Sequence, residues 1–136
     1  MATPSPSFRV VCVPAALAGA DGWDRWAREM LRDGEIALLP AEGGLAAIDE
    51  VARGLGVLSV AVIRGEPDGE RQERTVMDYA QALPLVWVGA GFTEAATGWA
   101  RDRGPMTLLV ETAGPLTDDQ RRRIDRFVAT LGRQSE

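Results

Sequence analysis

The sequence contains no histidine, no lysine and no asparagine, and Cys12 is the single cysteine among its 136 residues. Without histidine and lysine the chain cannot form a Ser-His-Asp triad, a Cys-His dyad, a histidine-ligated metal site, a Schiff-base lysine or the lysine of a phosphate loop. A lone cysteine allows no internal disulfide, so we expect a cytoplasmic protein. Any chemistry must use carboxylates, arginine, hydroxyl groups, one thiol and backbone amides.

Long apolar runs and positive charge are also scarce. The longest apolar stretches have about eight residues, far fewer than the roughly 18 that a membrane span needs, and Met1–Ser7 lacks the pattern of a signal peptide. The net charge of −5 does not provide the positive field on which most non-specific nucleic-acid affinity depends. We therefore expect no membrane association, disfavour nucleic acid as the main partner, and expect a protein partner or self-association instead.

The remaining composition is that of one globular domain. Hydrophobic residues make up 46% of the chain and charged residues 26%, which excludes wholesale disorder. The length is too short for two full cores. We expect a flexible lead-in over residues 1–7, a single α/β domain over residues 8–131 and a tail over residues 132–136.

Short apolar runs alternate with helical patterns along this domain. The runs are continuous and bounded by Gly, Pro or Asp, which is typical of strands buried on both faces. The alternation predicts a three-layer α/β/α domain with a largely parallel central sheet of about five strands. The expected strands are Phe8–Val13, Glu35–Leu39, Val57–Ile63, Leu85–Val88 and Met106–Val110, and the expected helices are Trp23–Arg32, Leu45–Leu55, Arg71–Leu83, Thr93–Arg103 and Thr117–Leu131.

The last helix has the clearest pattern. Thr117 and Gln120 have the spacing of a capping box, and Ile124, Phe127 and later apolar residues recur at helical spacing on one face. By contrast, Leu45–Leu55 fits either a helix or a strand followed by a turn, because short apolar patterns do not separate the two. The fold assignment depends on that segment.

Four segments carry a resemblance to a known family. They are the helix and glycine of Trp26–Gly34, the Asp49 segment Ala47–Arg53, the apolar run Ser59–Arg64, and Leu85–Ala96 with its Gly-Phe-Thr sequence. Together they resemble the Mrr-like branch of the restriction-endonuclease (PD-(D/E)XK) superfamily over roughly two thirds of the chain. The resemblance implies a restriction-endonuclease-like fold in which the Asp49 segment is a strand.

The same resemblance implies that nuclease activity is lost. Val62 stands where the family has a Gln or Glu, and a hydrocarbon cannot ligate the hard cation that such enzymes use. Arg64 stands where the family has a Lys, and its guanidinium does not replace a compact ammonium group. Asp49 alone makes a poor metal site. We therefore expect no metal, no cofactor and no enzymatic activity, and a binding or assembly module within a larger complex or a defence system.

A second interpretation uses the loops that follow the expected strands. In a doubly wound parallel sheet these loops meet at the carboxyl edge, where ligands bind. This favours a flavodoxin-like domain that binds a nucleotide or another small ligand near Pro14–Gly22, Glu42–Gly44 and Gly89–Thr93. The candidate ligand-binding residues are Glu42, Gly43, Gly44, Gly89, Gly91 and Thr93. These glycines and Thr93 also suit plain turns and a helix cap, which are the commoner reason for such residues.

One structural feature separates the two interpretations. A helix at Leu45–Leu55 with five parallel strands favours the doubly wound alternative, whereas a strand there paired with Val57–Ile63 favours the nuclease-like fold. Two further charged segments are expected to be structural: Gly65–Glu73 as a mobile acidic loop, and Arg121–Arg123 as a solvated helix face with local ion pairs.

We predict that the purified protein does not cleave DNA or RNA with Mg²⁺ or Mn²⁺, because metal-assisted cleavage needs carboxylate oxygens to position the ion and the attacking water. The assay is incubation of single- and double-stranded substrates with each metal. A third interpretation, an active nuclease that combines Asp49 with Glu29 or Glu50, predicts cleavage that disappears in Asp49→Ala.

Overall fold

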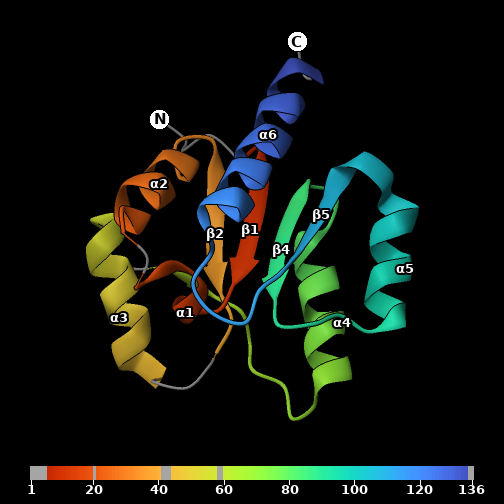
Figure 1. The fold of residues 1–136 in the computed structure, drawn as a ribbon. Helices are drawn as coiled ribbons and strands as arrows, with labels where there is room; N and C mark the ends of the chain where they lie inside the picture. Colours follow the sequence, from red (N-terminus) through yellow and green to blue (C-terminus); the bar gives the residue numbers. More distant parts are fainter. Residues whose placement is uncertain (1–5, 20, 41–43, 58–59, 135–136) are drawn as a thin grey trace, which may run out of the picture.

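A five-stranded sheet in which every neighbouring pair is parallel forms the centre of the molecule. This computed structural model describes residues 6–19, 21–40, 44–57 and 60–134. The strands lie in the order β3-β2-β1-β4-β5, so β1 is central and β3 and β5 form the edges. Figure 1 shows β2, β1, β4 and β5 side by side in this order. Their bounds are β1 Phe8–Cys12, β2 Gly34–Leu38, β3 Ala61–Val62, β4 Leu85–Gly89 and β5 Thr107–Glu111.

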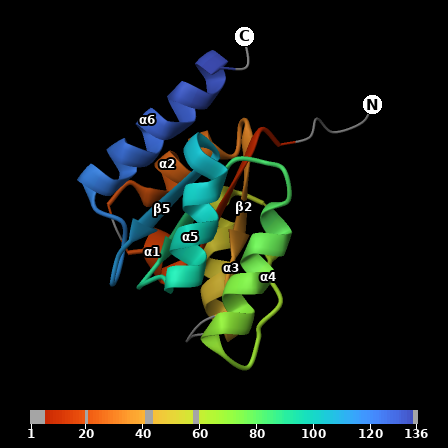
Figure 2. The ribbon, with the colours of Figure 1, turned by 90° about the vertical axis from the view of Figure 1, so that its right-hand side faces the viewer.

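Helices cover both faces of the sheet. Helices α1, α2, α3 and α6 pack on one face, and α4 and α5 pack on the other. Figure 1 shows α1, α2 and α3 to the left of the sheet and α4 and α5 to its right, and in Figure 2 the latter two lie toward the viewer. Their bounds are α1 Pro14–Leu17, α2 Trp23–Met30, α3 Gly44–Leu55, α4 Gly69–Ala80, α5 Glu94–Arg103 and α6 Asp118–Gln134. None of these described helices is long and apolar enough to cross a bilayer.

The central strands supply apolar side chains to both cores. In β1, Val10 and Cys12 join the core under α1, α2, α3 and α6, whereas Val11 joins the core under α4 and α5. This alternation follows from the two-residue repeat of a strand. Burial raises the pKa of the Cys12 thiol to about 12, so the thiol is neutral at physiological pH and inert, as its apolar surroundings predicted.

Two glycines let aromatic rings approach the backbone in the core under α1, α2, α3 and α6. A Cβ on Gly54 of α3 would lie 2.2 Å from the ring of Trp23, and a Cβ on Gly34 of β2 would lie 2.3 Å from the ring of Phe8. Trp26 is buried beside them, and its indole Nε1 donates a 2.8 Å hydrogen bond to Asp125 of α6. These contacts place Trp23 and Trp26 in the core of the domain.

The α/β class, the five-stranded sheet and the helices on both faces are confirmed. The ambiguous segment is helical, since α3 spans Gly44–Leu55, so Asp49 lies in a helix where the nuclease resemblance implied a strand. Because Leu45–Leu55 is helical and all five strands are parallel, the structure favours the doubly wound alternative over the nuclease-like fold. The flavodoxin-like strand order is wrong, however, because that order is 2-1-3-4-5 whereas this sheet has the order 3-2-1-4-5.

The expected strand at Val57–Ile63 is wrong in its extent and burial. Strand β3 is limited to Ala61–Val62, and both residues are exposed at the sheet edge. Residues 58 and 59 lie outside the described part of the chain. The physical reason is at the end of α3, where Gly56 has a φ of 72° and the amides of Gly56 and Val57 donate back to Arg53 and Ala52. This Schellman motif binds Val57 to the helix end, so it does not begin a strand.

The capping box of the last helix is confirmed. The Thr117 amide donates to Gln120 Oε1 at 2.9 Å, and the Gln120 amide donates to Thr117 Oγ1 at 3.1 Å. Arg121 and Arg122 form the expected ion pairs with Asp118 and Asp119. Arg122 and Arg123 are solvated as expected, whereas the Arg121 side chain is largely buried and donates to the carbonyl of Asp21. The sequence patterns missed α1, a single helical turn directly after β1.

The turn between α4 and β4 holds a residue in an unfavourable conformation. Gln81 has φ 49° and ψ −131°, and the Leu83 amide donates to the carbonyl of Ala80 at 3.1 Å. These values describe the first central position of a type II′ turn, which glycine prefers. The Arg103 guanidinium donates to the carbonyl of Gln81 at 3.3 Å and so secures the turn from α5.

We predict that Gln81→Gly raises the free energy of unfolding by about 1 kcal/mol, because glycine adopts this conformation without a steric penalty. Urea denaturation monitored by tryptophan fluorescence measures the change. Gln81→Ala is the matched control and should stay within about 0.5 kcal/mol of the parent, since the strained φ remains. Equal stabilisation by both substitutions would show that the backbone conformation is not the cause.

Candidate functional site

The strand order creates a crevice at the carboxyl edge of the sheet. From β1 the chain moves outward to β2 and β3 with α1, α2 and α3 on one face, then returns to β4 beside β1 and continues to β5 on the other side. The segments that follow β1 and β4 therefore turn to opposite faces. In open α/β sheets this reversal is the usual location of a ligand site.

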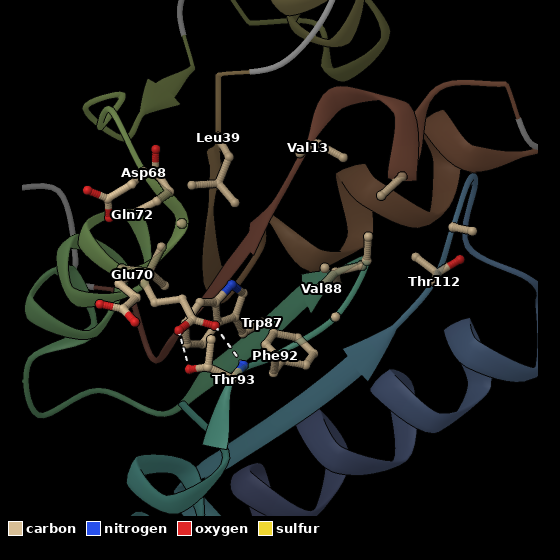
Figure 3. A pocket seen from close by; sticks show the side chains of 18 of the residues that line it. Val13, Leu39, Asp68, Glu70, Gln72, Trp87, Val88, Phe92, Thr93 and Thr112 are labelled. Atoms are coloured by element: carbon tan, nitrogen blue, oxygen red, sulfur yellow. Dashed lines mark hydrogen bonds between the residues drawn. The ribbon is translucent and has the colours of Figure 1, made fainter. Parts of the chain in front are cut away.

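A pocket of about 1100 Å³ lies at this reversal. Its wall comes from the turn after β1, from Leu39 after β2, from the start of α4, from β4 with the turn after it, and from residues 112–114 after β5. Figure 3 shows Val13, Val88 and Thr112 on one side of the pocket and Asp68, Glu70 and Gln72 of the α4 region on the other. Segments far apart in the sequence thus meet in one cavity.

Aromatic and aliphatic side chains form the apolar part of the wall. Trp87 of β4 contacts Phe92 edge-on, with ring centroids 5.2 Å apart, and Trp99 edge-on at 6.2 Å. Trp87 is buried, with 4% of its surface exposed, while Phe92 is half-buried in the turn that borders the pocket. Figure 3 shows Phe92 next to Trp87 at the base of the cavity. The two rings belong to the apolar part of the wall, and Phe92 is the more exposed of the two.

The polar part of the wall is the first two turns of α4. Asp68 caps this helix by accepting a 2.8 Å hydrogen bond from the Arg71 amide, and its carboxylate pairs with the Arg71 guanidinium at 3.5 Å. Glu70, Glu73 and Arg74 also line the pocket. The sequence predicted a mobile acidic loop over Gly65–Glu73. This prediction is wrong from Gly69 onward, where α4 begins. The Asp68 cap and the acidic first turn stabilise the start of this helix.

A carboxylate from α4 bridges the crevice to the start of α5. Glu73 Oε2 accepts a 3.0 Å hydrogen bond from the Thr93 amide, and Glu73 Oε1 accepts another from the Thr93 hydroxyl (Figure 3). Thr93 Oγ1 in turn accepts from the Ala96 amide at 3.2 Å and so caps α5. Glu73 therefore occupies the position at which an anion would meet the positive end of the helix.

The structure brings together half of the candidate ligand-binding residues. Gly89, Gly91 and Thr93 line the pocket, as do Ala15 and Ala16 from the loop after β1. Gly44 begins α3 with a φ of 53° and is not part of the pocket wall. Glu42 and Gly43 lie outside the described residues.

The residues singled out by the nuclease resemblance do not form a site. Asp49 is exposed on α3, and Val62 is 49% exposed on β3. Arg64 follows β3 and donates from Nε to Glu66 at 2.7 Å, a bond that lowers the pKa of the Glu66 carboxyl. None of the three lines the pocket, and the described residues contain no group of three or more acidic or cysteine side chains that would hold a metal ion.

Sequence reasoning missed the contribution of α4 to the site. The signal was present, because Asp68 before Gly69 and Glu70 has the pattern of a helix start. The pairing of Glu73 with Thr93 across 20 positions has no such local signal. No family model matches the chain, and neither a curated protein nor a solved structure gives a match.

We predict that Thr93→Ala lowers the free energy of unfolding by about 1 kcal/mol, because it removes the α5 cap and a hydrogen-bond partner of Glu73. Urea denaturation measures the difference. Thr130→Ala on α6 removes an exposed hydroxyl that bonds only to its own helix at Arg126, and should stay within about 0.5 kcal/mol of the parent. A larger loss in Thr130→Ala than in Thr93→Ala would contradict the role given to Thr93.

Proposed function

We propose that this domain binds a small organic ligand in the pocket at the carboxyl ends of β1 and β4, as the doubly wound alternative implies. The single observation that carries the proposal is the position of the pocket. It lies where the strand order reverses, and its wall includes Ala15 after β1 and the turn Gly89–Thr93 after β4. Ligands of open α/β sheets bind at this position.

The size and lining of the pocket support the same function. Small-molecule sites typically have volumes of roughly 300–1000 Å³ and combine apolar walls with a few placed polar groups. This pocket, of about 1100 Å³, is slightly larger than that range and combines the Trp87 and Phe92 rings with side chains of α4. A ligand with a flat apolar portion and one or two polar groups suits this wall.

The lining favours binding over catalysis. The chain has no histidine or lysine, and its one thiol, Cys12, is buried in the sheet and does not line the pocket. Nucleophile-and-base pairs that use histidine, lysine or cysteine therefore have no counterpart there. The inactive nuclease module gains no support from the helical Asp49 segment.

The proposal is tested by recording amide NMR spectra of the labelled protein with millimolar 2-phenylethanol, indole or benzamide. We expect at least one of these neutral aromatic probes to shift the amide signals of Ala15, Gly89, Gly91 and Thr93 more than those elsewhere. Ala15 is exposed and lines the pocket, so Ala15→Phe should fill part of the cavity and weaken binding about tenfold, a loss of roughly 1.4 kcal/mol.

The matched control is Ala129→Phe, which adds the same ring at an exposed site of α6 that is not part of the pocket wall. It should leave the affinity unchanged. Shifts that are scattered over the surface, or equal weakening by both substitutions, would refute binding at this pocket.

A further inference from the structure

We infer that the ligand of this pocket carries no phosphate or carboxylate and is an uncharged or amine-bearing aromatic molecule, because Glu73 occupies the anion position of the site. This inference rests on the proposed function and specifies the substrate class. Glu73 is then a specificity-determining residue, one that the sequence patterns did not single out.

The N-terminus of α5 already has a carboxylate bound to it. In doubly wound domains a phosphate sits against the amides at the start of a helix in the crevice. Here the Glu73 carboxylate accepts hydrogen bonds from both the amide and the hydroxyl of Thr93. An anionic ligand that displaced this carboxylate would break both of its hydrogen bonds to Thr93, and one that lay beside it would meet a like charge.

Two further backbone segments that border the pocket are also unsuited to an anion. The start of α4 already has the Asp68 carboxylate on the Arg71 amide. The turn after β1 has Pro14, Ala15 and Ala16, so one amide is absent and side chains stand where dinucleotide-binding turns have glycines. The pyrophosphate of a dinucleotide therefore has no cradle at this turn.

The charged side chains around the pocket also disfavour an anionic ligand. The pocket wall contains three carboxylates, Asp68, Glu70 and Glu73, and two guanidinium groups, Arg71 and Arg74. One of these guanidinium groups, on Arg71, is paired with Asp68. A fourth carboxylate, on Glu111 of β5, approaches the turn, since a Cβ on Gly91 would lie 3.5 Å from its Oε1. Carboxylates thus outnumber cations around the cavity.

The same groups suit a hydrogen-bond donor. A carboxylate offers about four lone-pair positions, and Thr93 engages two donors at Glu73, which leaves capacity for an amine or hydroxyl of the ligand. The Trp87 and Phe92 rings form the adjacent apolar wall. An aromatic group with a short aminoalkyl or hydroxyalkyl arm matches both features.

The experiment compares three probes of nearly equal size: 2-phenylethylamine, 2-phenylethanol and 3-phenylpropionate, which are cationic, neutral and anionic at pH 7. Each is titrated into the labelled protein while the pocket amide signals are followed. We expect the amine to bind at least as tightly as the alcohol, and the carboxylate to bind about tenfold more weakly than the amine. Binding of the carboxylate as tight as that of the amine would overturn the inference and leave the proposed function standing.

Two isosteric variants test whether Glu73 causes the affinity difference between the amine and the carboxylate. Glu73→Gln removes the charge of the half-buried carboxylate and keeps an oxygen that can accept from Thr93, so the difference between amine and carboxylate should shrink to about threefold or less. Glu70→Gln removes an equal charge from an exposed rim position, where solvent screens it, so the difference should change by less than about twofold. Amide NMR spectra of both variants are recorded to check that the fold is intact.

Two other results would contradict the role of Glu73 or the binding of a ligand at this pocket. If Glu70→Gln and Glu73→Gln reduced the affinity difference between the amine and the carboxylate equally, a specific role for Glu73 would be refuted. The general charge of the pocket rim would then be responsible for the difference. If none of the three probes shifts the pocket amides, the inference fails, and if indole and benzamide also leave these signals unchanged, the proposed function fails with it.

Discussion

The arrangement of this molecule depends on the burial of its central strands on both faces. Val10 and Val11 of β1 point to opposite sides, as do Val86 and Trp87 of β4, and all four are buried. Such strands require a helical layer on each side. To supply both layers in one chain, the connections must change faces, and here they do so between β1 and β4. The crevice at the carboxyl ends of these two strands is a consequence of that change.

The contact between Glu73 and Thr93 then determines the chemical character of the crevice. It joins the first turns of α4 to the start of α5, two elements that pack on the same face of the sheet. One carboxylate thereby holds the cap residue of a helix and fills the position of an anion. A site of the doubly wound type thus keeps its shape, with its apolar wall of Trp87 and Phe92, while its polar side favours donors over anions.

Features that depend on neighbouring residues were predictable. The capping box of Thr117 and Gln120, the cap at Thr93 and the burial of Cys12 follow from local spacing and composition. The loops after β1 and β4 were correctly expected at the carboxyl edge, and both line the pocket. The exposed edge strand β3 was mistaken for a buried one, because the Schellman motif at Gly56 and Val57 depends on backbone geometry that an apolar run does not reveal.

The sequence by itself determined the α/β class, the five strands and the absence of histidine and lysine chemistry, because periodicity and composition act locally. Only the tertiary structure decided whether Leu45–Leu55 is a helix, in which order the strands lie, and which residues meet at the pocket. The helical conformation of α3 is stabilised by Val51 and Leu55, which bury their side chains in the core that α3 shares with α1 and α2. Glu73 and Thr93 are 20 positions apart, and packing of α4 and α5 on one face of the sheet brings them together.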